Sequence, residues 1–259
     1  MGSPTVNWNP DQYLKFGDHR LRPALDLLAR IDLKSPRAMY DLGCGTGNTT
    51  ELLSRRWPDT NVTGIDSSPE MLEKARGSCP ELNFAEADLA SWSPESKADL
   101  LFSNAALHWL GHHESLFPRL MEVLSKGGQV AVQMPRNFDA PSHTAMRESV
   151  EAGPWAERLQ PRLHFEPVAE PEAYHDILAP HSECLDIWET VYLYVLEGNN
   201  PVVEWTRGTA LRPLLELLQP DEQEDFLEDY SRRILEAYPP QSQGRTLFPF
   251  RRLFMVATR

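Results

Sequence analysis

Acidic side chains and a glycine-rich turn occur where apolar runs of this sequence end, and residues placed in this way can form a binding site. The turn extends from Asp41 to Gly47 (Asp-Leu-Gly-Cys-Gly-Thr-Gly), after an apolar run at 38–40 and before a helix-forming run. Asp66 and Asp88 follow two further strand-forming runs. The carboxyl ends of parallel strands meet at one edge of a sheet, so this order predicts a nucleotide-type pocket.

The positions of the glycines indicate which group the pocket takes. Gly43, Gly45 and Gly47 are each two residues apart, and Asn48 stands where a dinucleotide fingerprint needs its third glycine. Asp41 begins the turn, and a carboxylate there repels phosphate and attracts an ammonium group. S-adenosylmethionine carries an ammonium and a sulfonium group and no phosphate, so the turn favours this methyl donor over a dinucleotide.

The remaining acids are expected to hold the nucleoside part of the donor. Asp66 is placed to accept hydrogen bonds from both ribose hydroxyls, and Asp88 to accept from the exocyclic amine of adenine. The alternative for Asp88 is a residue that caps a turn or a helix. Cys44 is expected to pack inside the glycine turn rather than to act as a nucleophile.

Alternating strands and helices must position these residues. The hydrophobic pattern predicts strands at 38–42, 61–66, 82–87, 98–103 and 129–134, and helices at 48–56, 69–76 and 116–124. Beyond Pro135 it predicts short helices in 136–183, strands at 185–196 and 250–257, and helices at 201–218 and 220–238. We expect an α/β fold with a doubly wound, mostly parallel seven-stranded sheet, an antiparallel edge and a helical cap over the active site.

This pattern also suggests three regions. Residues 1–34 are expected to form an N-terminal helical lid, residues 35–135 the donor-binding core, and residues 136–259 the substrate cap helices together with the final two strands of the sheet.

The bulk properties limit the partners. A net charge of −13 disfavours nucleic acid, and no apolar run approaches the ~20 residues that span a bilayer. Cys44, Cys79 and Cys184 are few and widely spaced, which argues against a disulfide framework or a zinc site and fits the cytoplasm. His112 and His113 are adjacent and would point apart, so no metal is expected. A monomer and a homodimer are both open.

The stretch 35–135 resembles the class I S-adenosylmethionine-dependent methyltransferases. The turn from Asp41 to Gly47 is similar to their first motif, and Asp66, Asp88 and the strand end Ser103-Asn104-Ala105 to the next three. The resemblance implies a Rossmann-like fold, S-adenosyl-L-methionine as donor and S-adenosyl-L-homocysteine as product. It implies donor binding by Asp41, Gly43, Cys44, Gly45, Gly47, Asp66, Ser67, Met71, Ala87, Asp88, Leu89, Asn104 and Ala105.

The residues after the fourth strand bear on the methyl acceptor. Asn104 to Trp109 (Asn-Ala-Ala-Leu-His-Trp) departs from the Asn/Asp-Pro-Pro-Tyr/Phe motif that is typical of amine methylation. The His-Trp pair resembles methyltransferases that esterify free carboxylates. The stretches 11–16, 20–23, 130–135, 204–205, 208–213 and 238–240 resemble the trans-aconitate 2-methyltransferase family over almost the full length. This resemblance implies a small di- or tricarboxylic acid as substrate, converted to a monomethyl ester.

The candidate acceptor residues follow from these stretches. We expect His108 and Trp109 beside the reacting carboxylate, with Gln133 as a hydrogen-bond donor. Every basic residue after Lys126 is arginine, whose planar fork matches a carboxylate. The remaining substrate contacts are expected from Tyr13, Phe16, Arg20, Tyr192, Trp205, Arg212 and Arg233.

Each of these residues has an alternative role. Trp109 is equally compatible with the core, His108 with a polar pocket wall, and Arg212 with capping of helix carbonyls. Arg233 stands next to Arg232, and the two point in different directions on a helix. Two other functions stay open: methylation of a hydroxyl group with His108 as base, and a non-catalytic protein that binds the donor.

Overall fold

The computed structural model describes residues 21–163, 168–208 and 210–259. The chain divides into two compact units, and both are made of separate chain segments. Of the described residues, the first unit comprises 21–134, 169–189 and 253–259, and the second comprises 135–163, 168, 190–208 and 210–252. Tyr13, Phe16 and Arg20, three of the expected acceptor residues, lie outside the described residues.

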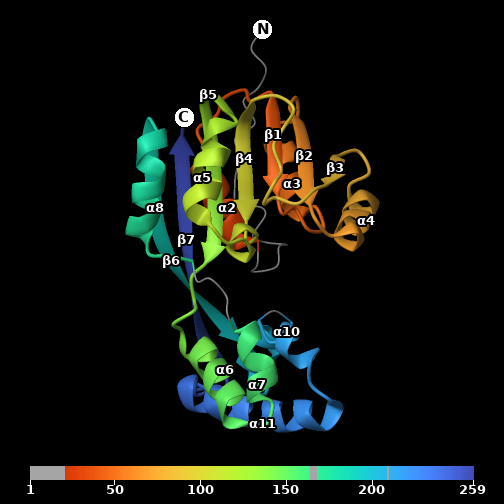
Figure 1. Ribbon diagram of the computed structural model, residues 1–259, viewed down its shortest axis with the longest axis vertical. Coiled ribbons are helices and arrows are strands. Elements are labelled where there is room, and N and C mark those ends of the chain that lie inside the picture. Colours follow the sequence, from red (N-terminus) through yellow and green to blue (C-terminus); the bar gives the residue numbers. More distant parts are fainter. Residues whose placement is uncertain (1–20, 164–167, 209) are drawn as a thin grey trace. The chain divides into compact units, whose positions relative to one another are not determined.

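The described strands form one seven-stranded sheet with the order β3-β2-β1-β4-β5-β7-β6 (Figure 1). The first five strands of the chain pair with one another in parallel. Their bounds are β1 Ala38–Leu42, β2 Asn61–Asp66, β3 Asn83–Glu86, β4 Ala98–Asn104 and β5 Leu124–Pro135. The last two strands are β6 (Cys184–Leu196) and β7 (Thr246–Thr258).

The edge formed by β7 and β6 is antiparallel. At one end of β5 the Gly127 amide donates to the Arg259 carbonyl, and at its other end the Arg136 amide donates to the Arg251 carbonyl. The Glu183 amide, just before β6, donates to the carbonyl of Thr258 at the end of β7. The mostly parallel seven-stranded sheet with an antiparallel edge confirms the predicted fold class.

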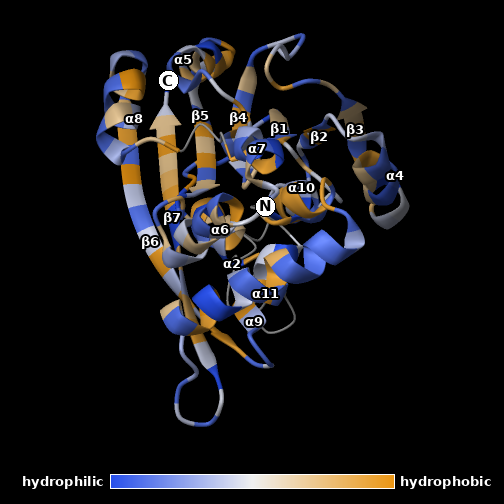
Figure 2. Cartoon of the chain, turned by 60° about the horizontal axis from the view of Figure 1, so that its bottom comes forward, coloured by the Kyte–Doolittle hydropathy of each residue, from blue (hydrophilic) through white to orange (hydrophobic). Residues whose placement is uncertain are grey.

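The central strands are buried on both faces, as parallel strands covered by helices must be. Leu100, Leu101 and Phe102 of β4 and Val130 and Val132 of β5 are all buried. Figure 2 accordingly colours β4, β5 and β7 largely as hydrophobic. These continuous apolar runs are the reason why the strands could be recognised in the sequence.

Helices of the first unit cover the sheet, and the start of one of them follows from local signals. They are α2 (Arg22–Leu28), α3 (Asn48–Arg56), α4 (Pro69–Ser78), α5 (His113–Glu122) and α8 (Pro171–Leu178). Figure 1 shows α5 in front of the sheet and α2 behind it. At α4 the Ser68 hydroxyl accepts from the Met71 amide at 3.3 Å, with Pro69 as first helical residue. Helix α5 begins at His113, three residues before its expected start.

The second unit is mainly helical. Its helices are α6 (Pro141–Ala152), α7 (Ala156–Leu159), α9 (Pro201–Arg207), α10 (Arg212–Leu215) and α11 (Pro220–Ala237). The apolar face expected for the last helix is confirmed, because Phe226, Tyr230 and Ile234 are fully buried. The prediction of one helix over 201–218 is wrong: α9 ends at Arg207, and α10 starts anew with Pro213 in its first turn.

Candidate active site

Three glycines give the turn after β1 its shape. Gly43, Gly45 and Gly47 all have positive φ angles, of 77°, 54° and 86°. The Gly43 and Cys44 amides both donate to the Ile65 carbonyl of β2, at 2.8 and 3.0 Å. A Cβ atom on Gly43 would lie 2.1 Å from the Cβ of Ala106. The turn therefore needs glycine both for its conformation and for the close approach of the chain that follows β4.

The Asp41 carboxylate lies buried at the end of β1. Its Oδ2 atom accepts from the hydroxyls of Thr49 and Thr50 at 2.6 and 2.7 Å, and both threonines belong to α3. Its Oδ1 atom is buried and has no hydrogen-bond partner among the described residues. Burial raises the pKa of Asp41 to about 6, although the two threonine hydrogen bonds lower it; the charge of Asp66 adds to the rise.

Asp66 ends β2 and ties the glycine turn to the start of α4. Its Oδ2 atom accepts from the Gly45 amide at 2.8 Å, and its Oδ1 atom from the Ser68 amide at 2.9 Å. Each carboxylate oxygen has a second lone pair, so these bonds leave acceptor capacity for a diol. The structure thus fixes the orientation of the carboxylate that was expected to accept from the ribose hydroxyls.

Asp88 closes the turn that follows β3. Its Oδ1 atom accepts from the Ala90 amide at 2.9 Å, and its carbonyl accepts from the Trp92 amide at 2.8 Å. The capping role that was the alternative for this residue is therefore present. Its side chain is also exposed, so adenine recognition stays a prediction.

The loop at 89–92 is held from outside by Arg119 of α5. The guanidinium donates to the carbonyls of Leu89, Ala90 and Trp92, at 2.9, 2.8 and 2.7 Å. Leu89 also approaches the glycine turn, with its Cδ1 atom 3.9 Å from a Cβ placed on Gly43. Sequence reasoning missed Arg119, because its contacts reach back 27–30 residues along the chain.

The end of β4 brings a second buried acceptor to the same edge. Asn104 pairs with Gln133 of β5, and its Oδ1 atom is buried with no hydrogen-bond partner among the described residues. Ala105 follows with a φ angle of 54°, and its amide donates to the Gln133 carbonyl at 2.9 Å. This turn packs Ala106 against Gly43.

His108 and Trp109 form a short 3₁₀ turn, η1 (Leu107–Trp109), directly after this bend. Their ring centroids lie 4.7 Å apart, and 59% of Trp109 is exposed. The core alternative for Trp109 therefore does not hold. Gln133 is fully buried at the adjacent strand end.

The other residues expected to bind the methyl donor lie at the same edge of the sheet, and they differ in how exposed they are to solvent. Cys44 is buried, and its sulfur lies 2.9 Å from a Cβ placed on Gly64, which fits the expected packing role. Burial, followed by the charges of Asp41 and Asp66, raises the pKa of the Cys44 thiol, so it stays protonated. Ser67 and Met71 are exposed beside Asp66, and Ala87 donates its amide to the Asp66 carbonyl at 3.0 Å.

Two aromatic residues expected to contact the methyl acceptor lie in the second unit. Tyr192 is buried and stacks on Tyr194, with ring centroids 6.2 Å apart. Trp205 packs on Tyr194 at 4.8 Å and on Phe248 at 5.9 Å. The structure brings Tyr192 and Trp205 into one aromatic cluster, and their contact with substrate stays a prediction.

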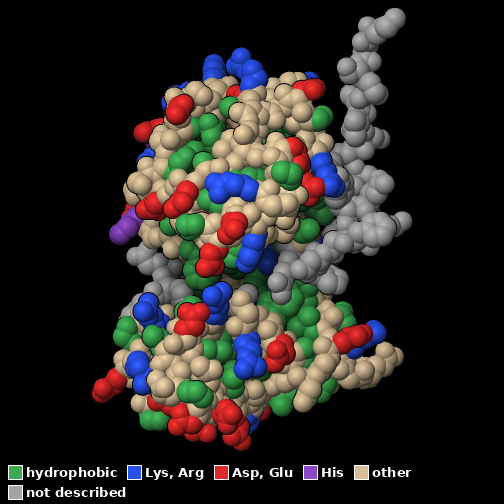
Figure 3. All heavy atoms as spheres, turned by 90° about the vertical axis from the view of Figure 1, so that its right-hand side faces the viewer, with side chains coloured by type: hydrophobic (Ala, Val, Ile, Leu, Met, Phe, Trp, Pro, Cys, Tyr) green, Lys and Arg blue, Asp and Glu red, His purple; other side chains and the backbone are tan. Residues whose placement is uncertain are grey.

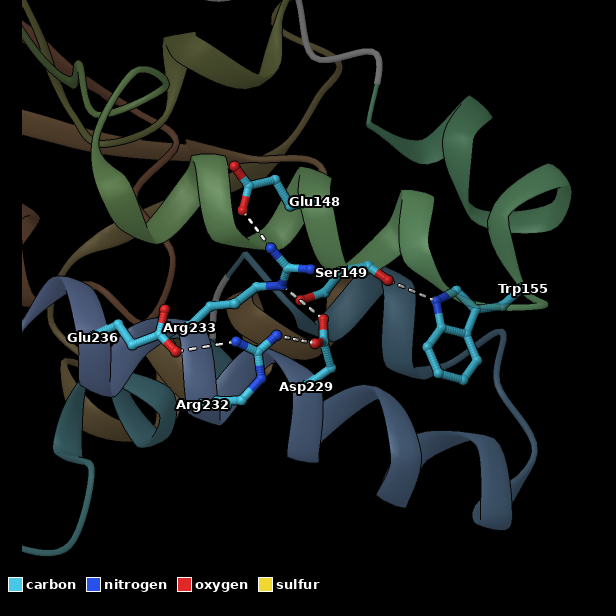
Figure 4. Close-up of polar contacts among 7 residues, drawn as sticks. All are labelled: Glu148, Ser149, Trp155, Asp229, Arg232, Arg233 and Glu236. Atoms are coloured by element: carbon cyan, nitrogen blue, oxygen red, sulfur yellow. Dashed lines mark hydrogen bonds and ion pairs between the residues drawn. The ribbon is translucent and has the colours of Figure 1, made fainter.

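The two described arginine candidates already have carboxylate partners within the second unit. Arg233 donates through Nε to Asp229 at 2.8 Å and through a terminal nitrogen to Glu148 of α6, as Figure 4 shows. Burial alone would raise the pKa of Asp229, but hydrogen bonds, led by that from Arg233, lower it to about 2. Arg212 donates to Glu216 at 2.8 Å, and 71% of its side chain is exposed. A substrate role for either arginine stays a prediction.

The side chains at this edge of the sheet fit S-adenosylmethionine. Two buried acceptor atoms, Asp41 Oδ1 and Asn104 Oδ1, have no hydrogen-bond donor within the described part of the chain, and an ammonium group would supply one. Asp66 and Asp88 add two more carboxylates at neighbouring strand ends. The described residues contain no cluster of three or more metal-binding side chains. Figure 3 shows acidic and basic side chains intermingled on one face of the protein.

Comparisons with known proteins identify the fold and the family of the chain. Residues 39–128 match the family model described as a methyltransferase domain. The YcgJ protein from Bacillus subtilis has a similar structure, with a TM-score of 0.61, 14% identity and coverage of 92% of this chain and 98% of that chain. A phosphoethanolamine N-methyltransferase from Haemonchus contortus, solved with S-adenosyl-L-methionine, gives a TM-score of 0.53 at 16% identity, over 91% of this chain and 52% of that chain.

A much closer similarity covers the whole chain. The trans-aconitate 2-methyltransferase of Azoarcus sp. (strain BH72) is 50% identical over 252 residues, which are 97% of this chain and 99% of that protein. The chain is therefore an S-adenosylmethionine-dependent methyltransferase, and it belongs to the trans-aconitate 2-methyltransferase family.

Proposed function

We propose that this enzyme transfers the methyl group of S-adenosylmethionine to one carboxylate of trans-aconitate, or of a very similar small tricarboxylic acid, and forms a monomethyl ester. The observation that carries the proposal is the near full-length identity of 50% to a protein named for this reaction. We place the reaction in the cytoplasm, since Cys44, Cys79 and Cys184 are all free thiols, as a reducing compartment keeps them. No described helix has the length and apolar character of a membrane span.

The chemistry suits a site without a strong base. S-adenosylmethionine supplies an electrophilic methyl group on a positively charged sulfur. One carboxylate oxygen forms a bond to the methyl carbon while the carbon–sulfur bond breaks, and no proton moves. A carboxylate is ionised at neutral pH, so it is already a nucleophile. Opposite charges are neutralised in the step, so a site that excludes water favours it.

The residues of the sheet edge then have distinct tasks. Asp41 and Asn104 offer buried acceptors to the ammonium group, and Asp66 offers its carboxylate to the ribose. His108 and Trp109, on the turn after β4, are proposed to border the reacting carboxylate. Their task is alignment, because the nucleophile must approach in line with the bond that breaks.

Further cations are proposed to hold the other carboxylates of the acid. Arg20, Arg212 and Arg233 are the candidates. Of these, Arg212 and Arg233 are among the described residues, and the exposed side chain of Arg212 makes it the better candidate of the two. The ion pairs of Arg233 with Glu148 and Asp229 would have to break before it could bind a ligand.

The proposal is tested with methyl-labelled S-adenosylmethionine and a panel of acids that includes trans-aconitate, cis-aconitate, citrate and simple dicarboxylates. We expect label in a product that releases methanol in mild base, with the highest kcat/KM for trans-aconitate. A base-stable product would contradict ester formation. Binding of the donor in a calorimeter without turnover of any acid would instead favour a non-catalytic protein.

The pH profile separates a carboxylate acceptor from a hydroxyl acceptor. A hydroxyl needs a base, and a histidine base such as His108 would lose activity below about pH 6.5. For a carboxylate acceptor we expect kcat at saturating donor to stay within about twofold between pH 6 and pH 8.

A further inference from the structure

His113 connects the turn that carries His108 and Trp109 to a helix from a distant part of the chain. Its Nε2 atom lies 3.0 Å from the Leu107 carbonyl oxygen, and its Nδ1 atom lies 2.6 Å from the Tyr174 hydroxyl of α8. All these residues belong to the first unit. The neighbouring His112 faces solvent, with 81% of its side chain exposed.

The partners of His113 determine which ring nitrogen carries the proton. A carbonyl oxygen can only accept, so Nε2 donates to Leu107. In the neutral ring Nδ1 then accepts from the Tyr174 hydroxyl. Tyr174 is fully buried, and its ring packs edge-on against Phe117, which in turn packs edge-on against the His113 ring. The imidazole is therefore fixed in orientation from both sides.

The Leu107 carbonyl is the point at which this arrangement acts on the turn. The same oxygen accepts from the Leu110 amide at 3.0 Å, so it receives two hydrogen bonds. The carbonyl belongs to the peptide plane that also contains the amide of His108. Holding the oxygen therefore limits rotation of that plane, and the plane determines where the His108 and Trp109 side chains project.

We propose that His113, held by Tyr174, is a positioning residue that fixes the Leu107–His108 peptide and so aligns His108 and Trp109 for methyl transfer. The relevance to catalysis rests on the proposed function. The effect on the turn does not, because it follows from the hydrogen bonds alone. His113 does not touch the reacting atoms and acts only through Leu107.

Two substitutions separate the two hydrogen bonds of the ring. His113→Gln places an amide nitrogen near the position of Nε2 and keeps a donor for the Leu107 carbonyl. His113→Asn reaches only the position of Nδ1 and loses that donor. His112→Asn is the matched control, because it removes the neighbouring exposed imidazole, and asparagine tolerates the φ angle of 57° at this position.

Steady-state kinetics give the first measurement. We expect His113→Asn to lower kcat about tenfold, because a small misplacement of aligning groups costs rate, with the Kd for S-adenosylmethionine unchanged within about twofold. His113→Gln should restore kcat to within about threefold of the parent, and His112→Asn should match the parent. Equal losses in the Asn and Gln variants, in proportion to their loss of thermal stability, would overturn the proposal and leave His113 a packing residue.

A spectroscopic measurement on the free enzyme gives the second. The protein is labelled with 5-fluorotryptophan, and the resonance of Trp109 is assigned with Trp109→Phe. We expect this resonance to move in His113→Asn and to return in His113→Gln. An unchanged resonance in His113→Asn overturns the proposal, whatever acid the enzyme methylates. A moved resonance in an enzyme that methylates no acid supports positioning of the turn and contradicts the proposed function instead.

Discussion

Asp41→Asn should make the donor-free enzyme more stable at neutral pH while weakening its affinity for S-adenosylmethionine. The folded protein raises the pKa of Asp41 from 3.8 to about 6, first because the carboxylate is buried. Folding therefore favours the protonated form of Asp41. The contribution of this protonated side chain to the stability of the folded protein is fully present below pH 4 and is lost as the pH rises to about 6. The difference of about two pKa units corresponds to about 3 kcal/mol, of which about 1.4 kcal/mol is lost between pH 5 and pH 7.5.

Urea denaturation at several pH values measures this effect. The free energy of unfolding of Asp41→Asn minus that of the parent should increase by about 1.4 kcal/mol between pH 5 and pH 7.5. Thr50→Val serves as a second variant, because it removes a hydrogen bond that lowers the pKa of Asp41. The pH-dependent step should then move to higher pH.

Donor binding should depend on the same proton in the opposite sense. A bound ammonium group favours the ionised carboxylate, so the affinity of the parent should weaken below pH 6, by up to about tenfold per pH unit. Asp41→Asn should bind the donor weakly at every pH, without this step. Parallel stability profiles of parent and variant across pH 5 to 7.5 would refute the reasoning, because Asp41 would then be ionised in the folded state without cost.

Three further substitutions test the assignments of other side chains. Asp66→Ala should weaken donor binding at least about tenfold, because the ribose loses its acceptor and the Gly45 amide its partner; unchanged affinity in calorimetry would contradict the placement. Arg119→Lys should raise the donor Kd several-fold at unchanged kcat, since one ammonium group cannot hold three carbonyls as the guanidinium does; a pure loss of kcat would argue otherwise. Arg233→Met should lower stability by about 1 kcal/mol with the KM for the acid unchanged, whereas a raised KM at constant melting temperature would assign Arg233 to the substrate.

The part of the fold that could be predicted is the part in which local composition reflects burial. Strands β4 and β5 are buried on both faces, so they appear in the sequence as continuous apolar runs. The start of α4 was recognisable because Ser68 and Pro69 act on the nearest turn only. The break between α9 and α10 was missed, because apolar periodicity continues through it and conceals the effect of Pro213.

The candidate site divides in the same way. Asp41, Asp66 and Asn104 were recognisable because each is one of the last two residues of a strand, and the fold places strand ends together. Arg119 and His113 were missed as contributors, because one arginine or histidine on an amphipathic helix carries no signal of the carbonyl that it will meet. The partner of Arg233 on α6 is 85 residues away in the chain, so its ion pair could not be read from spacing either.

The order of the last strands has a consequence for how the chain folds as it is synthesised. In the described sheet β6 is the edge strand and pairs with β7, which follows it in the chain yet lies between it and β5. When β6 leaves the ribosome its partner does not yet exist, so Tyr192 and Tyr194, buried in the final fold, stay exposed to other chains. Insertion of β7 pairs Gly127 with Arg259, a long-range contact of the kind that slows folding. We therefore expect nascent chains that have completed β6 but lack β7 to be prone to aggregation.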